Sequence, residues 1–144
     1  LGRRHPNQAA IFIGAVGVVR ATIGDKIVSV ASRSIQFLIV IANSIPNVKL
    51  NANQAGQMQA HGDPILQCLI EKLGDNLQKT RVLAEDAIVA MCLHHAFGTR
   101  MCLSTITRPI KKQEGTNAKK TMNSNKQVIG KYNLLHRILS DPDC

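Results

Sequence analysis

Residues 74–88 read Gly-Asp-Asn-Leu-Gln-Lys-Thr-Arg-Val-Leu-Ala-Glu-Asp-Ala-Ile, and the spacing inside this stretch decides how the chain folds. Asp75 precedes Arg81 by six residues, and Ala84 follows Arg81 by three. An Asp at the start of a helix accepts hydrogen bonds from backbone N–H groups that have no partner there. The Arg can bind an Asp and so tie neighbouring turns together. Because Ala84 is small, a second helix can pack closely against this one.

This order of residues resembles the second helix of a HEAT repeat, the helix-pair unit of one class of α-solenoids. Leu77, Ala84 and Ile88 fall on one face of the predicted helix, which we expect to face the core. The dipeptide Gly-Asp also occurs at Gly24-Asp25, fifty residues before Gly74-Asp75, a period slightly longer than that of common HEAT repeats. The simpler alternative is an ordinary amphipathic helix with a good N-terminal cap.

The composition favours helices packed on helices. The 144 residues include three Phe, one Tyr and no Trp, so the core must be built from aliphatic side chains. The expected helices cover residues 7–23, 26–44, 64–73, 76–95, 98–107 and 126–139, with a short helix at 51–60 inside a polar connector. We expect the last of them to turn Val128, Ile129, Tyr132, Leu135 and Leu139 inward.

These helices group into three pairs, at about residues 7–45, 64–95 and 98–139. A basic loop at 109–125 takes the place of a tight turn in the third pair. The predicted fold class is therefore all-α, an α-solenoid of HEAT-like helical pairs, with residues 1–144 forming a single fragment of a larger array.

The net charge of +9 is high for a chain of this size and indicates an acidic partner. The basic residues are unevenly spread, since Arg100 to Arg137 contains nine Lys or Arg and one acid, Glu114. The turns within the three pairs carry many of these basic side chains. Because turns of one type align along one edge of a solenoid, we expect a basic ridge there.

The sequence gives no pattern of an enzyme or a cofactor site. His94-His95 with Cys92 and Cys102 matches the spacing of no standard zinc module. There is no phosphate-binding Gly-rich loop and no assembled catalytic triad. We therefore expect no enzymatic activity, no cofactor and no metal. The longest apolar run, Ile35 to Ile45, is too short to span a bilayer, so no membrane contact is expected.

Four further stretches resemble the TOG domains, tubulin-binding arrays of six HEAT repeats. They are Ala15-Val16-Gly17-Val18-Val19-Arg20-Ala21-Thr22-Ile23, Asp25-Lys26-Ile27-Val28, Ile45-Pro46-Asn47-Val48-Lys49-Leu50 and Pro64-Ile65-Leu66. Within this group the chain is most similar to the TOG domain of a family of ciliary-tip proteins, and it covers about half of a full array. It lacks the Trp that many TOG domains present at the first turn.

The resemblance implies a non-enzymatic module that binds tubulin or microtubules, with other ciliary-tip or axonemal proteins as further partners. It implies a place in the cytoskeleton, at a cilium (tip or axoneme) or a centriole. The residues expected to contact tubulin are Asp25, Lys26, Asn76, Gln78, Lys79, Arg108, Lys111, Lys112, Lys119 and Lys120.

Two other functions remain open at this point. The chain could be a HEAT-repeat scaffold segment that binds a different protein. It could also be a basic, helical nucleic-acid-binding module, although it has few aromatic side chains on which bases could stack.

Overall fold

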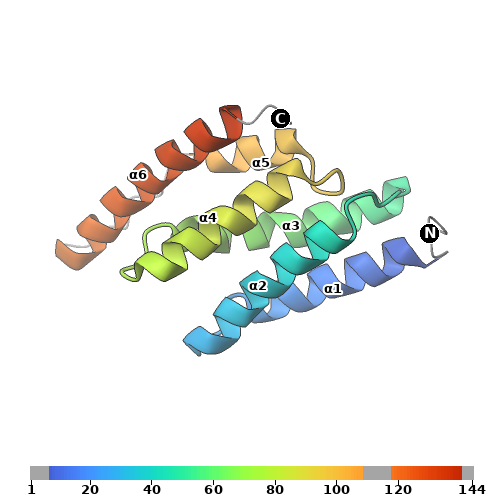
Figure 1. Cartoon of the computed structure of the whole chain (residues 1–144), viewed down its shortest axis with the longest axis horizontal. Helices are drawn as coiled ribbons and strands as arrows, with labels where there is room; N and C mark the ends of the chain where they lie inside the picture. Colours follow the sequence, from blue (N-terminus) through green and yellow to red (C-terminus); the bar gives the residue numbers. More distant parts are fainter. Residues whose placement is uncertain (1–6, 109–117, 141–144) are drawn as a thin grey trace.

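The computed structural model describes residues 7–108 and 118–140, with the backbone alone for 118–125, and every regular element in these ranges is an α-helix (Figure 1). The helices are α1 (Gln8–Thr22), α2 (Val28–Ser44), α3 (Ala52–Lys72), α4 (Gln78–Leu93), α5 (Thr99–Ile106) and α6 (Ala118–Leu139). The all-α prediction is confirmed. A transmembrane helix is not among them, because none of these described helices is both long and apolar enough to cross a bilayer.

The first four helices form two antiparallel pairs, α1 with α2 and α3 with α4, which lie side by side (Figure 1). Helix α1 packs on α3, and α2 packs on α4, so the odd and even helices form two layers. Helices α1, α2, α4 and α5 each lie within the ranges expected from the sequence.

The turns inside the two pairs repeat the same backbone geometry. The N–H group of Ile27 donates to Oδ1 of Asp25, and the N–H group of Leu77 donates to Oδ1 of Asp75, at 2.8 Å in both turns. Each Asp also donates its own N–H to the carbonyl three residues earlier, at 3.1 Å. The Asp side chain thus closes the turn, and Ile27 and Leu77 are the residues that cap α2 and α4. This differs from the expected direct cap by Asp75.

Helix α3 is longer than the sequence predicted. The expected short helix at 51–60 and the helix at 64–73 are one continuous element, and the prediction that Asp63-Pro64 begins a helix is wrong. Asn51 starts it with a capping box, in which the side chains of Asn51 and Gln54 each accept from the other's backbone N–H. Pro64 lies inside the helix and removes one backbone donor. The helix continues because Met58 before it and Ile65 after it are fully buried.

The core is mostly aliphatic, and one histidine is built into it. The largest side chains that are fully buried are Phe12, Ile35, Leu38, Met58, Ile65, Leu66, Leu69, Leu73, Ile88, Met91, Ile106 and Leu134. His94 stacks on Phe12 with ring centroids 4.8 Å apart. Its Nδ1 accepts from the N–H of Ala96, so Nε2 carries the proton and donates to the carbonyl of Ile45 at 2.6 Å. Burial lowers the pKa of His94.

Helices α5 and α6 pack on α3 and α4, and not chiefly on each other as the expected third pair would. Helix α6 begins at Ala118, so residues 118–125 are helical and do not belong to a loop as predicted, while residues 109–117 lie outside the described part.

The face of α6 that packs on the molecule also differs from the prediction. Leu134 and Ile138 are buried, whereas the exposed fraction is 60% for Ile129, 70% for Tyr132 and 74% for Leu139. Val128 is exposed as well, and Leu135 is half-buried. The prediction assumed α5 as the partner of α6, and the change of partner to α4 rotates the inward face.

Candidate functional site

The N-terminal ends of α2, α4 and α6 lie along one edge of the molecule, on the left of Figure 1. The two Gly-Asp turns lie on the same edge, since they lead directly into α2 and α4. We call this surface the turn edge and define it by residues 24–28, residues 74–79 and the first turn of α6.

Most of the residues predicted to bind tubulin lie at the turn edge. Asp25 and Lys26 are exposed in the first turn, and Asn76, Gln78 and Lys79 are exposed in the second. The backbone of Lys119 and Lys120 belongs to the first turn of α6. The predicted contacts Lys111 and Lys112 fall outside the described residues.

Arg108 lies away from this edge. Its guanidinium group forms an exposed ion pair with Asp63 at 3.6 Å, and its carbonyl accepts from Nζ of Lys131 at 2.8 Å. Asp63 is nine residues before the end of α3, which places it roughly 14 Å along the helix from the turn edge. Arg108 instead lines a separate hollow of about 920 Å³ between α3 and α5.

The turn edge is positive for two independent reasons. The end of a helix that carries free N–H groups bears a partial positive charge, which acidic residues in the first turn usually offset. The first turns of α2, α4 and α6 contain no acidic residue. Lys26, Lys79, Lys119 and Lys120 lie there or beside them, and Asp25 and Asp75 in the two turns offset two of these four charges.

Apolar side chains are also exposed at this edge. Ile27 and Leu77, which occupy equivalent places in the two turns, are 61% and 58% exposed, and Val28 is 62% exposed. The sequence analysis placed Leu77 on the buried face of α4, which is wrong because Leu77 precedes the first helical turn. Exposed apolar side chains among positive charges are typical of a surface that binds a protein partner.

Arg81 stabilises the second turn. Its Nη1 donates to the carbonyl of Asp75 at 2.6 Å and to the carbonyl of Asn76 at 3.1 Å. The sequence pattern predicted that Arg81 reaches an Asp, and the structure shows that it binds the backbone of Asp75. The two bonds hold the side chain at the end of α4, where its charge adds to that of the turn edge.

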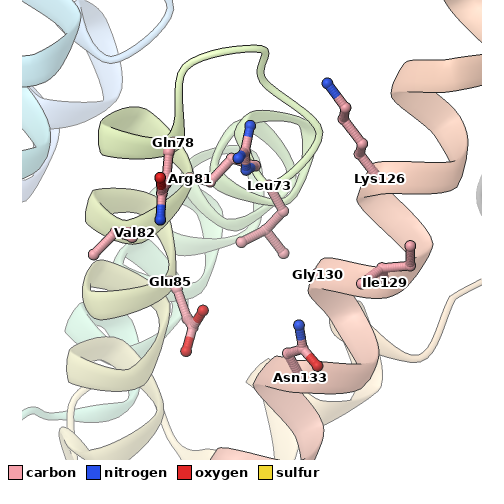
Figure 2. A pocket seen from close by; sticks show the side chains of 9 residues that line it. All are labelled: Leu73, Gln78, Arg81, Val82, Glu85, Lys126, Ile129, Gly130 and Asn133. Carbon is pink, nitrogen blue, oxygen red and sulfur yellow. The ribbon is translucent and has the colours of Figure 1, made fainter.

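A groove of about 330 Å³ opens between α4 and α6 next to the turn edge (Figure 2). Its walls are one stripe from each helix and a residue at the end of α3. The lining residues are Leu73, Gln78, Arg81, Val82, Glu85, Lys126, Ile129, Gly130 and Asn133. No motif in the sequence pointed to this groove, because it depends on where α6 lies against α4. A signal was present in the matching spacing, since residues 78, 81, 82 and 85 and residues 126, 129, 130 and 133 both follow the period of one helix face.

Close contact at one point sets the width of this groove. A side chain added at Gly130 would have its Cβ 2.9 Å from Cβ of Leu73, so α6 approaches α3 as closely as a glycine allows. The side-chain amide of Gln127 donates to the carbonyl of Ile70 at 3.1 Å. Farther along, Nη1 of Arg137 binds Asp86 at 2.9 Å and Glu85 at 3.1 Å.

Within residues 7–108 and 126–140, no three His, Cys, Asp or Glu side chains gather as a metal site would require. Both ring nitrogens of His94 bind backbone groups, which leaves the ring no lone pair for an ion. What the turn edge presents to solvent is a set of lysines beside exposed apolar side chains, among them Ile27 and Leu77.

The chain matches no protein-family model, no curated protein and no solved structure. The similarity to TOG domains that the sequence indicates thus stays a prediction.

Proposed function

We propose that the chain is a non-enzymatic, TOG-like segment of an α-solenoid of HEAT-like pairs and that it binds tubulin or microtubules through the turn edge. The cellular place that goes with this function is the cytoskeleton of a cilium, at its tip or axoneme, or of a centriole. The two repeated turns and the two-layer packing of α1 to α4 support the solenoid, because helix pairs of this kind stack in one direction.

One observation carries the proposal. Three helix N-termini lie along one edge, their first turns contain no acid, and four lysines there or beside them outnumber the two turn acids, Asp25 and Asp75. An acidic protein surface gains from each of these charges, and the exposed Ile27 and Leu77 offer apolar contact between them. Contacts of this type are individually modest and are weakened by salt. Several must act together for useful affinity.

The test is co-sedimentation with microtubules, together with binding to free tubulin, at two salt concentrations. The double variant Lys26→Glu with Lys79→Glu reverses two charges at the turn edge. We expect about a tenfold loss of affinity, which corresponds to about 1.4 kcal/mol. The loss should shrink at high salt, because the Debye length shortens.

A matched control changes the same number of charges at the opposite ends of the helices. Lys49 lies between α2 and α3, Arg100 lies in the first turn of α5, and both are exposed. The double variant Lys49→Glu with Arg100→Glu should bind tubulin as the unchanged chain does. An equal loss in both double variants would show that net charge alone drives binding and would contradict the turn edge as the site.

Binding of the unchanged chain to tubulin and to nucleic acid decides between the alternatives. Binding to RNA or duplex DNA at physiological salt, without binding to tubulin, would replace the proposal by a nucleic-acid-binding module. Absence of binding to tubulin and to nucleic acid would leave the scaffold segment that binds another protein.

A further inference from the structure

The groove between α4 and α6 has two cations at one end and apolar side chains beside them. Figure 2 shows that Arg81 and Lys126 point toward the end of the groove nearest the turn, whereas Glu85 and Asn133 lie at the other end. The two basic side chains come from opposite walls. Both reach the same residue of the turn, since Arg81 binds the carbonyl of Asn76 and Nζ of Lys126 lies near its side-chain oxygen.

Both cations have donors left for a ligand. A guanidinium group has five N–H donors, and Nη1 of Arg81 uses two of them on the carbonyls of Asp75 and Asn76. Three donors on the other two nitrogens remain. Nζ of Lys126 lies 3.5 Å from Oδ1 of Asn76, a distance at which a hydrogen bond is weak.

The one acidic side chain among the lining residues, Glu85, lies at the end of the groove away from the turn. The carboxylate of Glu85 accepts from Arg137 at 3.1 Å, and the same guanidinium group also binds Asp86. One guanidinium charge therefore faces two carboxylates, so one negative charge remains at the Glu85 end of the groove. Arg81 and Lys126 lie at the opposite end. The end of the groove near the turn keeps a net positive charge.

Two apolar side chains also line the groove, one on each wall. Val82 on α4 is 50% exposed and Ile129 on α6 is 60% exposed, and both line the groove. The groove holds about 330 Å³ and is open to solvent, so a short peptide segment can place one or two side chains in it.

We propose that the groove between α4 and α6 binds an acidic peptide segment, with a carboxylate between Arg81 and Lys126 and a neighbouring apolar side chain against Ile129 on the α6 wall. This inference rests on the proposed function, since the segment belongs to the acidic partner that the turn edge contacts. The groove requires more of the peptide than negative charge, because the peptide must also carry an apolar residue beside the acidic one.

The experiment measures the binding of fluorescein-labelled peptides to the whole chain by fluorescence anisotropy. The probes are Glu-Glu-Glu-Leu-Glu-Glu-Glu and the same peptide with Gly in place of Leu. We expect the Leu peptide to bind at least threefold more tightly than the Gly peptide. Equal affinities for the two peptides would overturn the apolar part of the site.

Substitutions then locate the binding. Lys126→Gln and Ile129→Ser should each weaken binding of the Leu peptide at least threefold, and Lys126→Arg should restore it, because the charge is kept. The controls are Lys49→Gln at the opposite end of the helices and Tyr132→Ser, which removes an exposed ring from α6 without lining the groove. They should bind as the unchanged chain does. Thermal unfolding of each variant verifies that α6 still packs.

The outcomes separate this site from the turn edge. Unchanged peptide affinity in Lys126→Gln and Ile129→Ser would overturn the groove, even where Lys26→Glu with Lys79→Glu still weakens tubulin binding. Weaker peptide binding in the groove variants supports the groove, even where the same double variant leaves tubulin binding intact and the proposed function fails.

Discussion

The turns at Asp25 and Asp75 lie fifty residues apart and form the same hydrogen bonds, and each joins two helices that pack on each other. Helices α5 and α6 also follow one another in the chain, but both pack mainly on α3 and α4. A short turn closed by an Asp side chain leaves the next helix little choice of partner, so α2 returns along α1 and α4 returns along α3. Helix α6 is held instead by side chains that reach α3, α4 and the carbonyl of Arg108. The difference shows that local turn chemistry determines pairing where the turn is tight, and that tertiary contacts determine it elsewhere.

Burial follows the same division. Helices α1 to α4 supply most of the fully buried side chains, while between Lys126 and Leu139 the buried side chains are Leu134 and Ile138. We therefore expect two levels of stability in one chain, a well-packed body of α1 to α4 and a more easily released α6.

The largest expected effect tests these two levels with one chemical change. Leu66 in α3 and Leu134 in α6 are both fully buried. Leu66→Ala should lower the free energy of unfolding by about 2–5 kcal/mol, the usual range for such a cavity. Leu134→Ala should cost less in global unfolding, and it should speed amide hydrogen exchange in α6 while α1 to α4 stay protected. Equal loss of protection in all six helices would show a single cooperative unit and would break the comparison.

The part of the fold that the sequence predicted is the part with local signals. Gly-Asp at residues 24–25 and 74–75 marked both tight turns, and four helices lie inside their expected ranges. The error in α3 has a local cause, because Asp63-Pro64 is a common way to start a helix and the capping box at Asn51 and Gln54 was overlooked.

The errors in α6 and in the site have a non-local cause. Which face of α6 turns inward depends on the helix it packs on, and the sequence of α6 does not indicate whether that helix is α4 or α5. The turn-edge lysines were found because they lie beside the turns. The groove was missed because Arg81 and Lys126 are forty-five residues apart and meet only through the packing of α6.

A second prediction concerns the junction of the two pairs, where His94 contacts Phe12 of α1 and the carbonyl of Ile45 after α2. Burial lowers the pKa of His94 in the folded chain, while the unfolded chain titrates near 6.5. The unfolded state therefore binds more protons as the pH falls from about 6.5 toward the folded pKa. Stability should fall over that window, by at most about 1.4 kcal/mol per pH unit, and should be fully present above it.

Urea unfolding between pH 5 and pH 8 measures this dependence. The variant His94→Gln keeps a donor and an acceptor but loses the ring that stacks on Phe12, so it should be less stable at pH 7.5. Because Gln does not titrate, its free energy of unfolding should change less with pH below 6.5. An identical slope in both proteins would assign the pH dependence to other groups.

The third prediction sharpens the comparison between the two repeated turns. Asp25→Ala removes the acceptor of the Ile27 N–H and should lower stability by about 1 kcal/mol. Asp75→Ala should lower stability less, because Arg81 still binds two carbonyls of the second turn. The first turn has no such support, since the residue equivalent to Arg81 is Ala31. Replacement by Asn at either position should be nearly neutral, since its side-chain oxygen also accepts. A larger loss at Asp75 than at Asp25 would contradict the supporting role of Arg81.

The smallest expected effect comes from a pair of glycines that differ only in their surroundings. Ala in place of Gly inside a helix stabilises it by about 0.5–1 kcal/mol when nothing interferes. At Gly56 in α3 an added Cβ meets no atom within 4 Å, so Gly56→Ala should give this gain in urea unfolding.

At Gly130 the same Cβ would lie 2.9 Å from Cβ of Leu73, and the strain of about 1–3 kcal/mol exceeds or cancels the gain. We expect a net loss of about 0.5–1 kcal/mol, concentrated in α6 and visible as faster hydrogen exchange there. Because α6 forms one wall of the groove, Gly130→Ala should also weaken binding of the acidic Leu peptide, whereas Gly56→Ala should leave it unchanged. A stabilised Gly130→Ala variant would show that α6 can move away from α3 without cost and that its other contacts, such as those of Gln127, Leu134 and Arg137, determine its position.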